Sequence, residues 1–129
     1  MQATNIAEIE SLLNAAVRLN PNFAAAYLQL GIVHSAYPVG GTGIRDVGAD
    51  YFDATSNFHK AIEADPNLAE PHYRLAQVYR IIGKKAEAKM EIEAYERLVK
   101  QSALETHTER HQIQQFVYTL RDQTPPPKP

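Results

Sequence analysis

The sequence contains no cysteine, no excess of positive charge and no long apolar run. Without cysteine, the chain can form no disulfide and offers no thiolate as a nucleophile or metal ligand. Its formal net charge is -2, whereas nucleic-acid-binding proteins usually present a basic face to the phosphates. No apolar stretch approaches the roughly 18 to 20 residues that cross a bilayer. The start of the chain also lacks the basic and apolar regions of a signal peptide. We therefore expect neither a nucleic acid nor a membrane as partner, and the sequence indicates no compartment.

The length and composition are those of one domain with a modest core. The chain has 129 residues, of which 44% are hydrophobic. A chain of this size buries roughly two-thirds of its unfolded surface on folding, which is enough for stability without disulfides.

Internal repetition is the main signal in the sequence. Segment 19–27 (LNPNFAAAY) matches segment 64–72 (ADPNLAEPH) at an offset of 45. That offset alone would suit a HEAT or armadillo array. However, Ala54, Phe58 and Ala61 recur as Ala88, Ile92 and Tyr95 at an offset of 34. The period is therefore 34, and one copy carries an insertion of 11 residues (45 minus 34) within the glycine-rich stretch 37–48.

These repeats resemble the tetratricopeptide repeat family. The first helix of that repeat carries an aromatic residue, then Leu and a small residue, then a second aromatic residue. In this sequence the matching positions hold Tyr27, Leu30, Gly31 and His34 in one repeat. In the next repeat they hold His72, Leu75, Ala76 and Tyr79. The second helix carries a small, a large and a small residue before a closing proline, matched by Ala54, Phe58, Ala61 and Pro66. The spacing i, i+3, i+4, i+7 places the four first-helix residues of each repeat on one face of that helix.

The resemblance implies an all-α solenoid of antiparallel helix pairs. We predict a repeat domain over 5–121 with the insertion at 37–48, followed by a flexible Pro-rich tail at 122–129. About two repeats would be preceded by a half-repeat. Helices are expected at about 6–18, 23–36, 50–64, 69–82, 84–101 and 104–121. The last would be a capping helix that turns back near 102–106 and covers the last repeat with its apolar stripe. A continuous helix that swaps onto a neighbouring molecule is the alternative.

In this family the first helices of the pairs line a concave binding groove. Carrying those positions over gives the expected partner-binding residues, which are Leu28, Gln29, Ile32, Tyr73, Arg74, Gln77 and Arg80. Arg74 and Arg80 could bind a carboxylate in a bidentate manner. A solvated helix face, with Glu70 paired to Arg74, is the plainer interpretation. A clamp for a C-terminal carboxylate is disfavoured because Leu28 and Ile32 occupy positions where the family's clamp needs Lys and Asn.

Two other features were weighed as catalytic or cofactor sites. The glycines of 37–48 match neither nucleotide-binding fingerprint, because no Lys-Ser/Thr follows them and no strand is predicted before them. His107 and His111 are i, i+4 on a helix and could share a metal ion, but Glu105 is the only plausible further ligand. We expect no cofactor.

We therefore predict a protein that is not an enzyme and that binds a peptide or helix of another protein. The alternative is a structural segment that self-associates through its first or last helix. A metal- or nucleotide-dependent enzyme is the least favoured reading. Partner, pathway and compartment are not specified, because this fold serves many unrelated functions.

Overall fold

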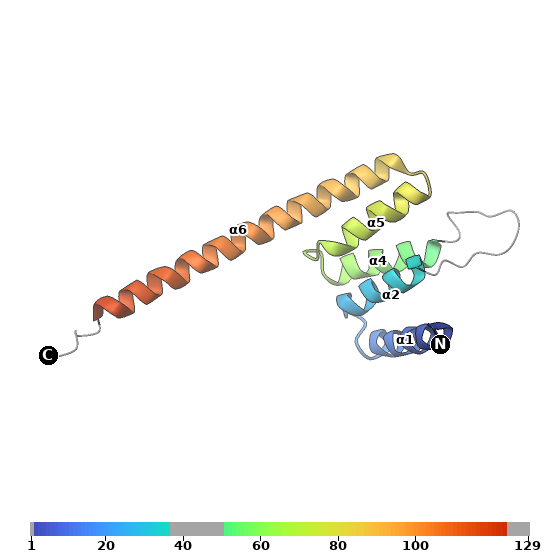
Figure 1. The fold of residues 1–129 in the computed structure, drawn as a ribbon, viewed down its shortest axis with the longest axis horizontal. Helices are drawn as coiled ribbons and strands as arrows, with labels where there is room; N and C mark the ends of the chain where they lie inside the picture. Colours follow the sequence, from blue (N-terminus) through green and yellow to red (C-terminus); the bar gives the residue numbers. More distant parts are fainter. Residues whose placement is uncertain (1, 37–50, 124–129) are drawn as a thin grey trace, which may run out of the picture. The chain divides into compact units, whose positions relative to one another are not determined.

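The computed structural model describes residues 2–36 and 51–123, and within them all regular structure is α-helical. The helices are α1 (Gln2–Leu19), α2 (Ala24–Ala36), α4 (Phe52–Ala64), α5 (Glu70–Ile81) and α6 (Lys85–Gln123) (Figure 1). The insertion expected at 37–48 lies outside the described residues. So does most of the expected tail, although α6 continues to Gln123. The chain divides into two compact units, Met1–Leu98 and Val99–Pro129.

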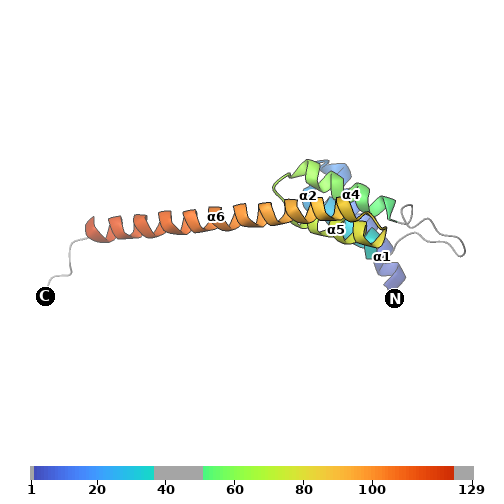
Figure 2. The same ribbon diagram turned by 90° about the horizontal axis from the view of Figure 1, so that it is seen from above.

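The unit Met1–Leu98 is a stack of antiparallel helices. Consecutive helices run side by side in alternating directions (Figure 1, Figure 2). Helix α2 contacts α1, α4 and α5, and α4 also contacts α5. One repeat thus consists of α2 and α4, and the next consists of α5 and the first part of α6. Helix α1 is the second helix of a preceding half-repeat, which confirms the predicted architecture.

The turns between the repeats have the same local structure. After α1, the side chain of Asn20 accepts a hydrogen bond from the Asn22 amide at 3.2 Å. After α4, Asp65 does the same for the Asn67 amide at 3.1 Å. The intervening prolines cannot continue the helical hydrogen-bond ladder. An Asn or Asp side chain that bonds the backbone two residues on stabilises such a turn. The repeat in the sequence therefore also appears in the hydrogen bonds of the turns.

A glycine ends α5. Gly83 has φ +85°, a left-handed conformation that favours glycine. The Lys84 amide donates to the Tyr79 carbonyl at 2.7 Å, and the Gly83 amide donates to the Arg80 carbonyl at 3.3 Å. This pair of bonds is a Schellman motif, which satisfies carbonyls at the helix end. It reverses the chain between α5 and α6.

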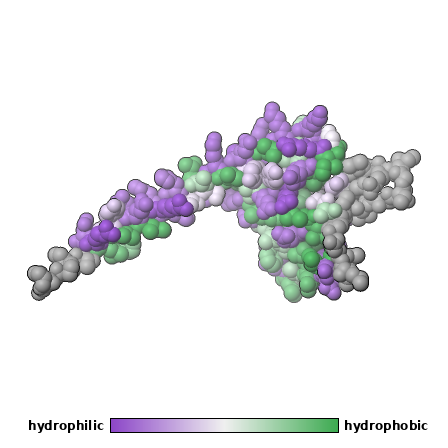
Figure 3. Space-filling model, viewed as in Figure 1, coloured by the Kyte–Doolittle hydropathy of each residue, from purple (hydrophilic) through white to green (hydrophobic). Residues whose placement is uncertain are grey.

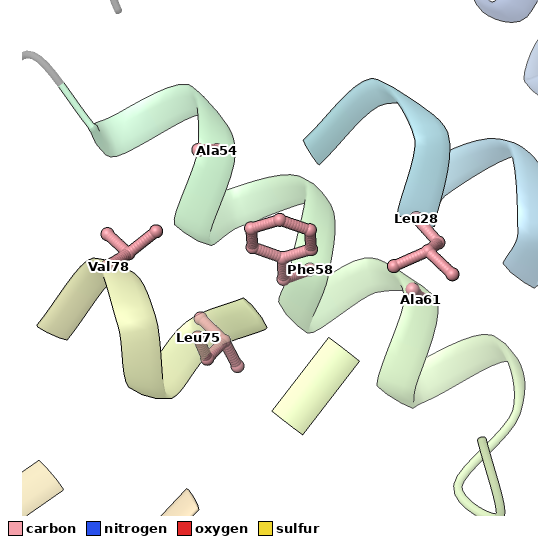
Figure 4. Packing of buried hydrophobic residues seen from close by; sticks show 6 residues of the cluster. All are labelled: Leu28, Ala54, Phe58, Ala61, Leu75 and Val78. Atoms are coloured by element: carbon pink, nitrogen blue, oxygen red, sulfur yellow. The ribbon is translucent and has the colours of Figure 1, made fainter. Parts of the chain in front are cut away.

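The core is small and apolar, and it is centred on Phe58. This side chain is 0% exposed and packs with five other residues in Figure 4, which are Leu28, Ala54, Ala61, Leu75 and Val78. Gly31 makes the close approach of α2 to α4 possible. A Cβ atom added there would lie 2.5 Å from Cδ1 of Phe58 and overlap the ring. The small residues of the repeat thus let the helices approach closely enough to enclose one large ring.

Polar contacts at the edge of the core link neighbouring helices. His72 Nδ1 of α5 lies 2.6 Å from a Glu91 carboxylate oxygen of α6, and both side chains are largely buried. His59 Nε2 of α4 lies 3.2 Å from the Tyr79 hydroxyl of α5. The pKa of Tyr79 is raised by burial, and further by the charges of Glu91 and Glu87. Histidine side chains thus link α5 to α6 and α4 to α5.

The prediction of a separate capping helix is wrong. Helix α6 runs from Lys85 to Gln123 without the turn expected near 102–106. No glycine or proline lies between Lys84 and Thr124 to stop it. The polar stretch that suggested a turn instead bonds along the helix. The Thr106 and Thr108 hydroxyls donate to the carbonyls of Ser102 and Leu104, each at 2.9 Å. Hydroxyls that bond four residues back are compatible with a continuous helix.

Candidate partner-binding groove

A groove lies between the C-terminal halves of α2 and α5, with a volume of about 540 Å³. Helix α2 contributes Ile32, Ser35 and Ala36 to its wall. Helix α5 contributes Arg74, Gln77, Val78, Arg80 and Ile81. Residues 74, 77, 78 and 81 follow the i, i+3, i+4, i+7 spacing that places side chains on one helix face. The first helices of two successive repeats therefore form the groove together.

The wall is apolar on the α2 side and mixed on the α5 side. The Ser35 hydroxyl donates to the Ile32 carbonyl at 2.9 Å, so its donor is already used within α2. Val78 is buried and forms the floor toward the core, whereas Ile81 is 57% exposed. An incoming segment would therefore meet aliphatic surface beside the polar groups of α5.

Two arginines give the groove its charge. An Arg74 Nη2 atom lies 3.2 Å from a Glu70 carboxylate oxygen one turn earlier on α5. Arg74 Nε is buried and has no hydrogen-bond partner among the described residues. Arg80 is exposed, and within the described part of the chain it forms no ion pair. Among the residues that the structure describes, no acidic side chain lines the groove. The local charge therefore favours an acidic group.

A second hollow, between α5 and the first part of α6, differs in charge. It shares Arg80 with the groove, and helix α6 contributes both basic residues (Lys85 and Lys89) and acidic residues (Glu93 and Glu96) to its lining. Opposite charges in one hollow largely offset each other. Among the described lining residues, those of the α2–α5 groove are the more uniform of the two sets in charge.

The structure brings four of the seven expected groove residues together, which are Ile32, Arg74, Gln77 and Arg80. Leu28 is 5% exposed and belongs to the core, so a groove ligand cannot reach it. Gln29 is exposed but does not line the groove. The Tyr73 ring packs on Tyr95 of α6 with centroids 5.3 Å apart, also outside the groove wall.

Sequence reasoning missed Ser35 and Val78 as wall residues. Ser35 follows Ile32 by three residues, and Val78 follows Arg74 by four, so helical spacing alone would have placed both on the correct faces. Leu28 was expected to line the groove, but it lies in the core, because the boundary between core and groove runs along one side of α2. That boundary depends on how deeply α4 packs, which the repeat pattern does not specify.

Other candidate sites have less support. Among the described residues, no three His, Asp or Glu side chains are placed to hold a metal ion. His107 and His111 are exposed on α6. No helix in the described ranges is long and apolar enough to cross a membrane. The glycine-rich stretch 37–48 lies outside these ranges.

Comparison with known proteins identifies the class of fold. The sequence model of the tetratricopeptide repeat family matches residues 58–90, from the middle of α4 to the first turns of α6. The chain therefore contains a tetratricopeptide repeat, which confirms the resemblance found in its sequence. No curated protein is significantly similar to it in sequence.

Among solved structures, the crystal structure of MamA is similar to this chain, with a TM-score of 0.61 and 20% sequence identity. The match covers 73% of this chain and 48% of MamA, so the chain spans about half the length of that protein. At this identity the likeness supports the helical-repeat fold alone. Repeat folds of this kind generally serve as interaction surfaces.

Proposed function

We propose that the chain is a non-catalytic recognition module whose α2–α5 groove binds an extended peptide or a helix of another protein. The observation that carries the proposal is the composition of the groove wall. Aliphatic side chains lie there beside Arg74 and Arg80, and none of the described lining residues is acidic. A partner segment with an acidic residue next to apolar ones complements this surface in both charge and polarity.

The two arginines play different parts in the proposal. Arg74 is held against α5 by Glu70, so its guanidinium is already positioned and already partly neutralised. Arg80 is exposed and forms no ion pair within the described residues. A guanidinium can bind a carboxylate through two parallel hydrogen bonds. We therefore assign Arg80 the main contact with an acidic side chain and Ile32 the main apolar contact.

The experiment is a selection of peptides from a random library on the purified chain, followed by fluorescence anisotropy with the selected sequences. We expect enrichment of Asp or Glu beside apolar residues. Arg80→Glu and Ile32→Ser should each weaken binding by about tenfold or more, equivalent to about 1.4 kcal/mol.

The matched control is Arg97→Glu, which makes the same charge change at an exposed position of α6 outside the groove. It should leave the affinity nearly unchanged. Selected peptides without acidic residues, or equal losses in Arg80→Glu and Arg97→Glu, would remove the groove from consideration. Circular dichroism of each variant checks that the fold is retained.

A further inference from the structure

The second part of α6 displays an apolar stripe to solvent. All residues from 99 to 122 are exposed. Ile113 is 62% exposed, Phe116 64% and Val117 45%. Hydrophobic residues gather along one side of this part of the helix, and hydrophilic residues occupy the other (Figure 3). Helices in water gain most of their stability from packing an amphipathic face against a partner. This stripe is therefore a candidate contact surface.

The segment can be aligned with the seven-residue repeat of a coiled coil, with apolar residues at four of its seven core positions. Counting from Val99, the core positions a and d hold, in order, Val99, Ser102, Thr106, Glu109, Ile113, Phe116 and Leu120. The first three a positions are thus Val, Thr and Ile. Within parallel coiled coils, residues branched at Cβ in position a are typical of two-stranded pairs. Thr106 can be buried there because its hydroxyl already donates to the Ser102 carbonyl.

The charges beside the stripe match a second copy of the same segment. Residues 99–122 contain three basic residues (Lys100, Arg110 and Arg121) and three acidic ones (Glu105, Glu109 and Asp122). Two such segments therefore carry no net repulsion.

The positions of these charges favour parallel pairing. Glu105 occupies position g and Arg110 position e, on opposite flanks of the stripe. In a parallel pair, Glu105 of one copy lies opposite Arg110 of the other, and this contact forms twice. An antiparallel pair that aligns the apolar residues would instead place Arg110 within about one helical turn of Arg121 of the other copy, on the same flank.

Position 109 is the weak point of a parallel pair. Glu109 at position d would face Glu109 of the other copy. Because position e borders the site that a d residue enters, Arg110 of the other copy lies beside each Glu109. The position therefore lowers the affinity of a parallel pair, and Arg110 offsets part of this loss.

We propose that residues 99–122 of α6 form a parallel two-stranded coiled coil with the same segment of a second copy of the chain. This surface lies outside the α2–α5 groove, so the proposal stands whether or not the groove binds a peptide.

The first experiment is sedimentation equilibrium across a hundredfold range of concentration. The mass should rise from one chain toward two, and the helical circular dichroism signal should rise with it. Ile113→Ser combined with Phe116→Ser should raise the dissociation constant by more than about tenfold. The matched control is Leu104→Ser, since Leu104 is 66% exposed but occupies position f on the opposite side. A chain that stays monomeric throughout, or a control that disrupts pairing equally, overturns the proposal.

The direction of pairing is tested by charge reversal. Arg110→Glu should weaken a parallel dimer by several fold, and Glu105→Arg in the same chain should restore it. In an antiparallel dimer, Arg110→Glu would instead relieve repulsion from Arg121 and tighten pairing, which would overturn the parallel arrangement.

Because the chain has no cysteine, an introduced thiol gives a second readout of direction. Ser102→Cys at position d should form a disulfide-linked dimer under mild oxidation, whereas Lys100→Cys at position b should not. Equal crosslinking of the two variants would contradict the proposed contact through positions a and d.

Discussion

Two phenylalanines show how differently the two units of this chain use apolar residues. Phe58 in α4 is 0% exposed and is enclosed by residues of α2, α4 and α5, whereas Phe116 in α6 is 64% exposed. In the unit Met1–Leu98, alanines and a glycine at repeat positions let neighbouring helices close around the ring. In the described part of the other unit, α6 carries apolar residues that no neighbouring helix there encloses. The unit Met1–Leu98 thus buries its apolar core within the chain, whereas α6 of the other unit leaves an apolar surface exposed to solvent.

The same substitution in both regions tests this contrast with the largest expected effect. Phe58→Ala should lower the free energy of unfolding by about 3–5 kcal/mol, because it leaves a cavity in a fully enclosed site. Phe116→Ala, measured where the chain is monomeric, should change it by less than about 0.5 kcal/mol. Urea unfolding followed by circular dichroism measures both. Comparable losses would mean that Phe116 is buried in the isolated chain.

Gly31 tests how tightly the core region is closed. Gly31→Ala adds a methyl group that overlaps the Phe58 ring. Alanine gains about 1 kcal/mol in helix propensity over glycine, but overpacking typically costs about 1–3 kcal/mol. We expect a net loss of about 1 kcal/mol in the free energy of unfolding.

The control for Gly31 is a double-mutant cycle. Phe58→Leu should remove most of the clash, so Gly31→Ala should be nearly neutral or stabilising in that background. A gain in stability from Gly31→Ala alone would show that α2 and α4 can separate at little cost.

The core region was largely predictable from the sequence, and the second region was not. Phe58, Gly31 and the alanines recur at one period, and each has a packing role that the period explains. Stripe residues such as Ile113 and Phe116 were recognised as a helix face, but their contacts were predicted wrongly. A helical pattern shows which residues share a face and does not specify what covers it. The turn expected near 102–106 rested on polarity, yet Thr106 and Thr108 bond to carbonyls within α6.

The expected groove residues stay a prediction, and packing depth divides them in the structure. Four residues carried over from the family's groove positions line the α2–α5 groove, namely Ile32, Arg74, Gln77 and Arg80. Leu28 belongs to the core because α4 packs against that side of α2. Whether a residue lines the groove or belongs to the core depends on how deeply the helices pack. The repeat pattern of the sequence does not specify that depth.

The contact between His72 and Glu91 tests whether polar bridges help to close the repeat. Their side chains are 14% and 19% exposed, so loss of one partner leaves the other poorly solvated. His72→Ala should lower the free energy of unfolding by about 1–2 kcal/mol. The matched control is Glu70→Gln, which breaks the more exposed pair with Arg74 and should cost less than about 0.5 kcal/mol. Equal effects would assign the His72 loss to packing alone.

The smallest expected effect is the alkaline behaviour of Tyr79. Burial and the charges of Glu91 and Glu87 raise its pKa in the folded chain, whereas an unfolded tyrosine titrates near about 10. As the pH rises above that value, the unfolded chain releases this proton first, so stability falls until the pH passes the folded pKa. Tyr79→Phe removes this contribution. The stability advantage of the native chain over the variant should therefore shrink between neutral pH and pH values above about 10. Thermal unfolding of both chains across this range measures the difference, and a constant difference would show that Tyr79 titrates alike in both states.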